Sequence, residues 1–162
     1  MSRKLGTIVV LLAGIIAVLA AWASTSRTAY AEGAKRTIYM AAIEPKGSTT
    51  VAKEPFPTAK LPPGAGYGLK APDKDGKWGV KTYRWLPSTI VVNQGDEVTL
   101  EILGVNGKEH HAVIEDYNIN FTIRRGQVTR VNFKADNVGI FNIVCNVHRP
   151  AMTGQLVVLP RR

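Results

Sequence analysis

The sequence predicts an all-β protein, an antiparallel sandwich or barrel of short strands. Three observations indicate this class. Segments rich in β-branched and aromatic residues follow one another from Thr82 onward: TYRWLPSTIVV, DEVTLEIL, HHAVIEDY, NFTIRR, TRVNFKA, GIFNIVC and TGQLVVL. The turn signals NQGD, GVNGK, RRGQ and ADNVG separate them. VTLEI and RVNFKA alternate apolar and polar residues, as half-buried strands do, and no convincing helical stripe follows residue 31.

The first 31 residues have the pattern of an export segment. A short basic start, MSRK, precedes an uninterrupted apolar run over residues 5–23. AWA at 21–23 and AYA at 29–31 both fit the small-residue pattern of a cleavage site, so we predict a signal peptide. The run is also close to the roughly 20 residues that span a bilayer, so an uncleaved membrane-anchor helix is the alternative. Either way, residues 32–162 are predicted to lie in the periplasm or another extracytoplasmic space.

Residues 32–81 are predicted to hold one strand and a long extended segment. RTIYMAAI, residues 36–43, has the character of a strand that joins the core domain of residues 82–162. From Glu44 to about Lys81, six prolines and six glycines oppose both helix and central strand. We interpret 44–81 as an extended loop that wraps the core, makes a contact or docks a partner, and not as a second domain.

Charge and motifs exclude several classes of function. The chain carries a net charge of +9. Arg3, Lys4 and Arg27 lie in the first 31 residues, which contain no acid, so residues 32–162 carry 9 − 3 = +6. The basic residues are scattered without interleaved aromatics, so we do not expect nucleic-acid binding. A positive field suits an acidic partner or membrane head groups, although a merely solvated basic surface fits equally well. The sequence has no Ser-His-acid set in context and no phosphate loop, and we do not predict an enzyme.

The candidate metal ligands are Cys145, His148, Met152 and His110. The only cysteine of the chain is followed by a histidine three residues on and a methionine seven residues on. A single cysteine in an exported chain cannot form an internal disulfide, which leaves a buried apolar residue, a link to another chain, a reactive thiol or a metal ligand. His110 opens a strand whose start can meet the end of GIFNIVC at one pole of a sandwich. One thiolate, one thioether and two imidazoles suit copper better than zinc.

Two neighbours of His110 compete with it for a place at the metal. His111 is adjacent, and successive strand residues face opposite ways, so only one of the two histidines can point at the metal. We favour His110, with His111 either supporting the site or facing solvent. Glu109 would add a carboxylate ligand, but an exposed turn residue is the better interpretation of it.

These segments resemble the cupredoxin family over about residues 82–160. HHAVI is similar to the segment with the first copper-binding histidine, and FKADNVGIFNIVCNVH resembles the F-x-A-x-x-x-G-x-F-x-x-x-C-x-x-H signature of the family. The resemblance is closest to nitrosocyanin and to the copper domain of nitrous oxide reductase. It implies a Greek-key β-sandwich and one copper ion that cycles between Cu(I) and Cu(II), with His110, Cys145 and His148 in the plane and Met152 axial.

The spacing departs from the known members, since C-x2-H-x3-M is one residue shorter than the C-x2-H-x4-M of plastocyanin. One cysteine also excludes a binuclear copper site. The resemblance implies a blue-copper protein that transfers single electrons, with a c-type cytochrome or a copper enzyme as partner. His148 would be the exit for the electron, bordered by Arg149, Pro150 and Ala151.

Two alternatives to an electron carrier stay open at the level of the sequence. A nitrosocyanin-like centre with an open coordination position would act on a small molecule, and a backbone carbonyl could replace Met152 as the axial group. The second alternative is a protein that delivers or stores copper. The absence of a Met-rich or His-rich tract argues against this alternative.

Overall fold

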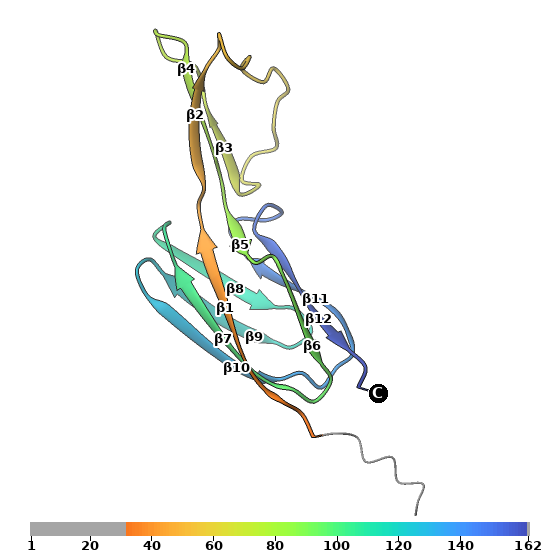
Figure 1. Cartoon of the computed structure of the whole chain (residues 1–162). Coiled ribbons are helices and arrows are strands. Elements are labelled where there is room, and N and C mark those ends of the chain that lie inside the picture. The colour runs from red at the N-terminus through yellow and green to blue at the C-terminus, as the bar shows by residue number, and fades with distance from the viewer. Residues whose placement is uncertain (1–31, 162) are drawn as a thin grey trace, which may run out of the picture. The chain divides into compact units, whose positions relative to one another are not determined.

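The computed structural model describes residues 32–161, which form twelve strands and no helix (Figure 1). The apolar run 5–23 and both cleavage patterns lie outside the described residues. Within residues 32–161, no helix has the length and apolarity that a membrane crossing requires. The strands are β1 Lys35–Ile43, β2 Lys46–Thr50, β3 Tyr67–Lys70, β4 Lys77–Thr82, β5 Arg84–Leu86, β6 Thr89–Asn93, β7 Glu97–Gly104, β8 Glu109–Ile114, β9 Ile119–Arg124, β10 Val128–Lys134, β11 Gly139–Cys145 and β12 Thr153–Leu159.

Two sheets pack face to face, which confirms the all-β sandwich. One sheet has the order β10-β7-β1-β5 and the other β6-β12-β11-β8-β9. In β7, Val98, Leu100 and Ile102 are buried while the residues between them are not, as the alternation of EVTLEI predicts. These side chains share one hydrophobic core with residues of the opposite sheet, among them Ile114 and Ile143. The strand near the start of the described chain also belongs to the sandwich, because β1 runs parallel to β7 along most of its length.

Residues 44–81 differ from the extended loop that the sequence predicts. They include a three-stranded sheet of order β2-β4-β3, whose central strand β4 pairs antiparallel with both neighbours. The prolines of the segment fall before, between or after these strands, where no ladder hydrogen bond is lost. The three strands are only four to six residues long, so the high proline and glycine content masks them in the sequence.

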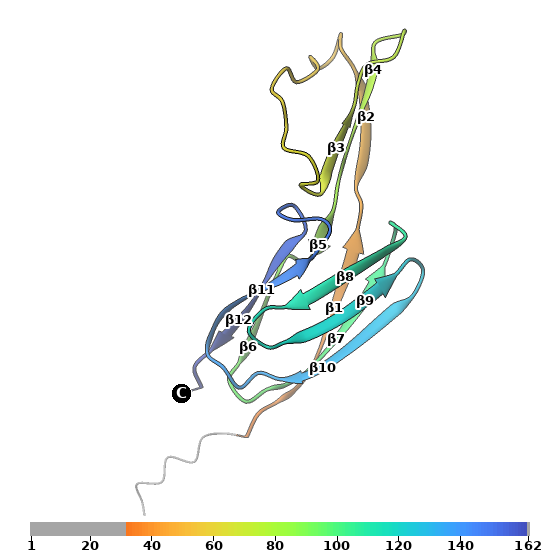
Figure 2. The same ribbon diagram turned by 180° about the vertical axis from the view of Figure 1, so that it is seen from behind.

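The small sheet is an extension of the sandwich along two of its strands. β1 continues through Glu44 and Pro45 into β2, and β4 continues through Tyr83 into β5 (Figures 1 and 2). Ile43 pairs with Arg84, and Lys46 pairs with Lys81. The register is therefore unchanged across the junction, because both strands advance by three residues between these pairs. It follows that Glu44 lies opposite Tyr83 at the root of the small sheet.

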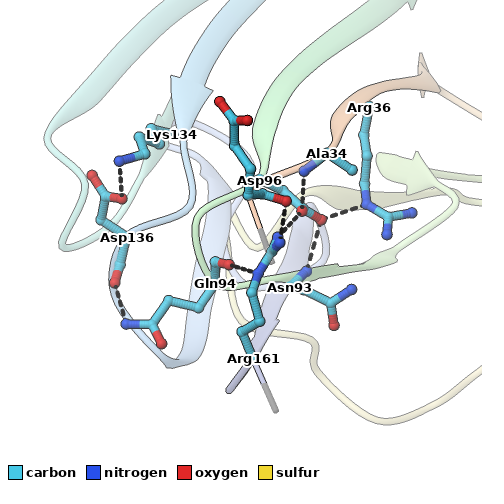
Figure 3. A network of polar contacts seen from close by, with 9 residues as sticks. Ala34, Arg36, Asn93, Gln94, Asp96, Lys134, Asp136 and Arg161 are labelled. Carbon is cyan, nitrogen blue, oxygen red and sulfur yellow. Dashed lines mark hydrogen bonds and ion pairs between the residues drawn. The ribbon is translucent and has the colours of Figure 1, made fainter. Parts of the chain in front are cut away.

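A buried carboxylate joins the two ends of the described chain. Asp96, in the β6–β7 turn, is fully buried and accepts hydrogen bonds from the backbone N–H groups of Ala34 and Asn93, at 2.9 and 3.0 Å (Figure 3). Arg36 and Arg161 both form ion pairs with it. Burial alone would raise the pKa of Asp96, but the hydrogen bonds from Asn93, Arg36 and Ala34 outweigh it and the pKa lies below the ordinary value.

We expect Asp96→Asn to lower the free energy of unfolding by about 2–3 kcal/mol at neutral pH, because charged hydrogen bonds are lost. The pKa of Asp96 is depressed on folding, so its contribution is complete above the unfolded-state pKa and disappears as the pH falls through the folded-state pKa. The stability of the variant should therefore depend less on pH at the acid end than that of the wild type.

Urea unfolding at several pH values measures both effects. Asp136→Asn is the control, because Asp136 is exposed and pairs only at the surface with Lys134, so its loss should cost less than about 1 kcal/mol. Equal losses in the two variants would show that the buried network does not hold the chain ends.

Candidate metal centre

The pairing of β8 with β11 brings together two candidate ligands that are 35 residues apart in sequence. Cys145 is the last residue of β11 and pairs with Ala112 of β8. His110 is the second residue of β8 and lies two positions away from Ala112, on the same face of the sheet. The loop 146–152 then leaves the end of β11 and contributes His148.

The three side chains converge on one point at this pole of the sandwich. The Sγ atom of Cys145 lies 3.2 Å from Nδ1 of His148 and 4.0 Å from Nδ1 of His110. One ligand atom from each residue lies within 4.8 Å of the others. Cys145 and His110 are buried, at 0 and 1% exposure, whereas His148 is half-buried. Of these three candidate ligands, His148 is thus the one whose side chain is partly exposed at the surface.

The ring of His110 is held by the turn before β8. Its Nε2 lies 3.2 Å from the backbone oxygen of Asn106, so Nε2–H donates to this carbonyl and Nδ1 keeps a lone pair toward Cys145. A Cβ on Gly107 would lie 2.8 Å from Nε2 of His110. Glycine at this position, with φ of +82°, lets the turn approach the imidazole closely.

Burial shifts the pKa values of the Cys145 thiol, at the end of β11, and of the His148 imidazole, in the loop. Burial raises the pKa of the Cys145 thiol, and hydrogen bonds from the backbone N–H groups of Val147, His148 and His111 oppose this effect. Burial and the nearby His110 lower the pKa of His148. A neutral imidazole at neutral pH is the form that binds a metal.

Hydrogen bonds close the loop 146–152 on itself. The N–H of Cys145 donates to the carbonyl of Met152, and the N–H of Met152 donates to the carbonyl of His148, at 3.0 and 2.9 Å. Met152 is fully buried in the hydrophobic core beside Cys145. The short spacing between His148 and Met152 therefore still places the methionine inside, at the base of the loop.

The structure separates the two competing neighbours from this cluster. The side chain of His111 is 53% exposed and contacts Thr122 Oγ1 and Glu109 on the outer face of β8. Glu109 also pairs with Arg124. His110 is thus the inward-facing histidine, as the sequence predicts, and Glu109 is directed away from the cluster.

Sequence reasoning assigned no chemistry to Tyr83, which lies directly against the cluster. Its ring stacks on the imidazole of His148, with the centroids 3.6 Å apart and the planes 12° from parallel. Tyr83 shares a strand face with Trp85, which is buried in the core, so strand alternation was the signal that its side chain faces inward. The stacking itself has no signal in the sequence.

A β-sandwich that gathers one thiol and two imidazoles at one pole defines a metal-binding type of all-β domain. The chain belongs to the cupredoxin-like domain family, whose sequence model matches residues 62–158, more than half of the chain. The match begins at residue 62, so part of the small sheet lies within it. A search of curated proteins gave no match.

Several solved structures are similar to the chain at low sequence identity. The metal-binding domain of the Cu(I)-exporting P-type ATPase CopA of Streptococcus pneumoniae D39 is 12% identical with a TM-score of 0.47, over 79% of this chain and 89% of that one. The multicopper oxidase mgLAC is 17% identical with a TM-score of 0.47, over 80% and 40%. Auracyanin A, a blue copper protein of Chloroflexus aurantiacus, is 15% identical with a TM-score of 0.44, over 76% and 98%.

We expect Gly107→Ala to displace the ring of His110, because the added Cβ would meet Nε2 at 2.8 Å. Gly126→Ala is the matched control, since Gly126 also has a positive φ, of +74°, but has open space around it. Both variants should lose about 1 kcal/mol of stability from left-handed strain. Only Gly107→Ala should move the imidazole resonances of His110 in the NMR spectrum of the metal-free protein; equal changes in both spectra would contradict the close contact.

Proposed function

We propose that the chain is an exported mononuclear copper protein that carries single electrons between redox partners. The observation that carries this proposal is the convergence of Cys145, His110 and His148, which each place one ligand atom within 4.8 Å of the others. These three residues would hold the copper, and the thioether of the buried Met152 is the proposed fourth, weak ligand. Copper bound there would supply reversible one-electron chemistry between its Cu(I) and Cu(II) states.

The donor set fits copper in both chemistry and spacing. Two ligand atoms that bind one metal at bonds of about 2.0–2.3 Å, roughly 120° apart, lie about 3.5–4 Å from each other. The sulfur-to-nitrogen distance of 4.0 Å to His110 lies at the upper end of this range, and the distance of 3.2 Å to His148 lies below it. Two imidazoles, one thiolate and a weak thioether are the ligands of electron-transfer copper, whereas structural zinc takes four strong ligands.

The environment of the site supports a carrier over a small-molecule enzyme. Glu109, the residue that would make a carboxylate-ligated centre, instead pairs with His111 and Arg124 on the outer face of β8. Met152 is fully buried on the inner side of the loop. A site closed by protein groups on this side favours electron transfer with little rearrangement between oxidation states.

The half-buried His148 is the proposed point of exchange with a partner. Exposed residues border it in the loop, namely Val147, Arg149 and Pro150. The net charge of +6 over residues 32–162 favours a partner with an acidic face, such as a c-type cytochrome or a copper enzyme. We propose residues 1–31 as the signal or anchor that exports the chain, and the periplasm or a similar compartment as its location.

The full chain loaded with one equivalent of Cu(II) should show an intense blue thiolate band and narrow copper hyperfine splitting in its EPR spectrum. Cys145→Ser should abolish the band, because the thiolate is its source. An equally intense thiolate band in Cys145→Ser would falsify the assignment. A weakly coloured wild type with wide splitting would instead support a tetragonal site with an oxygen ligand.

A separate replacement tests whether Met152 would act as the fourth ligand. Met152→Leu conserves volume but removes the thioether, so the reduction potential and the optical spectrum should both shift. Met40→Leu is the matched control, because Met40 is buried in the same core on β1. Both variants should cost less than about 1.5 kcal/mol of stability. An unchanged potential and spectrum in Met152→Leu would mean that another group is axial.

A further inference from the structure

The face of His148 is covered by an aromatic ring from the root of the small sheet. Tyr83 lies between β4 and β5, and its ring is nearly parallel to the imidazole at a centroid distance of 3.6 Å. The same tyrosine meets the His110 ring edge-on at 5.8 Å. The Tyr83 ring therefore lies against both imidazoles of the cluster. It does so through its aromatic faces and edges, without acting as a metal ligand itself.

A buried carboxylate holds this tyrosine in place. Glu44, which is 4% exposed, is the neighbour of Tyr83 across the junction, and burial together with this carboxylate raises the pKa of the Tyr83 hydroxyl. The two oxygens of Glu44 also pair with Lys46 and Lys81, at 3.0 and 3.3 Å. The Lys81 ammonium lies 5.6 Å from the centroid of the Tyr83 ring as well. The phenol therefore lies beside a cluster of charges around a buried carboxylate, which restricts movement of its ring away from the imidazole.

Asn106 connects the same carboxylate residue to the other imidazole. The amide of Asn106 forms two hydrogen bonds with the backbone of Glu44, one to its N–H at 2.7 Å and one to its carbonyl at 2.8 Å. The backbone oxygen of Asn106 accepts the hydrogen bond from Nε2–H of His110. Glu44 therefore neighbours both residues that orient the imidazoles. Tyr83 stacks on the ring of His148, and Asn106 accepts a hydrogen bond from the ring of His110.

We propose that Tyr83, anchored by Glu44, is the positioning residue that fixes the imidazole plane of His148 toward the metal. This inference rests on the proposed copper site and adds a role for the small sheet. The torsion that rotates an imidazole about its bond to Cβ has broad wells, so a half-exposed histidine needs a neighbour to define its plane. No hydrogen-bonded partner takes that role for His148 in the described residues, apart from Cys145 itself, and the phenol ring supplies the constraint instead.

The test compares Tyr83→Leu with Tyr83→Phe in the full chain, with and without copper. Phenylalanine keeps the stacked ring and loses only the hydroxyl, whereas leucine removes the ring. Tyr117→Leu is the control for a general loss of packing, because Tyr117 packs on Phe133 and Phe141 and donates a hydrogen bond to the carbonyl of Asn137.

In the metal-free protein, a stacked phenol shifts the ring protons of His148 upfield. We expect this shift to disappear in Tyr83→Leu, and to persist in Tyr83→Phe and Tyr117→Leu. With copper, Tyr83→Leu should bind Cu(II) about tenfold or more weakly and change the EPR hyperfine splitting, and phenylalanine should restore most of both. Glu44→Gln should raise the reduction potential, because a negative charge near the metal stabilises Cu(II) more than Cu(I).

Wild-type spectra in Tyr83→Leu, both without and with copper, would overturn the positioning role while leaving the copper assignment intact. A change of the same size in Tyr117→Leu would also overturn it, because it would show a general effect of packing. If the wild type itself gives no thiolate band with Cu(II), the proposed function fails, and the metal-free shift of His148 still reports whether Tyr83 orients the ring.

Discussion

The antiparallel pairing of β8 with β11 determines where the centre lies, since it sets Cys145 opposite Ala112 and so places His110 beside the thiol. Both residues stand on strands buried in the shared core, and neither side chain can leave without disturbing it. The loop that carries His148 needs only to close over this fixed pair. Its hydrogen bonds to Cys145 and Met152 do so within seven residues, which explains how a spacing shorter than that of plastocyanin still returns the methionine to the interior.

The small sheet and the segment before β3 give the loop 146–152 a second set of contacts. The carbonyl of Ala65 accepts a hydrogen bond from the N–H of Ala151 at 3.1 Å, and a Cβ on Gly66 would lie 2.2 Å from the carbonyl oxygen of His148. Backbone from the segment before β3 therefore touches the loop at its far side from β8. The unbroken register from the sandwich into the small sheet keeps this segment, Glu44 and Tyr83 in fixed positions around the half-buried imidazole.

Much of the fold and the centre of the site could be predicted from the sequence, for local reasons. Alternation revealed β7 and β10, and the close spacing of Cys145, His148 and Met152 revealed the loop. Strands β2, β3 and β4 were missed because short strands rich in glycine and lysine have no alternation to detect, and the prolines between them dominate the pattern. The contact of Tyr83 with Glu44 depends on a register between segments 39 residues apart, which composition and spacing do not encode. The export segment stays a prediction.

The buried Asp96 places both ends of the described chain at one pole. Ala34 and Arg161 meet on this carboxylate, whereas Glu44 at the opposite end of β1 belongs to the surroundings of the imidazoles. The nine residues of β1 span about 30 Å at roughly 3.3 Å per residue. Residue 32 therefore lies at the other end of β1 from Glu44, roughly one strand length away. A partner that docks at the half-buried His148 would therefore approach the domain at the end of β1 opposite to the pole where residues 32 and 161 meet.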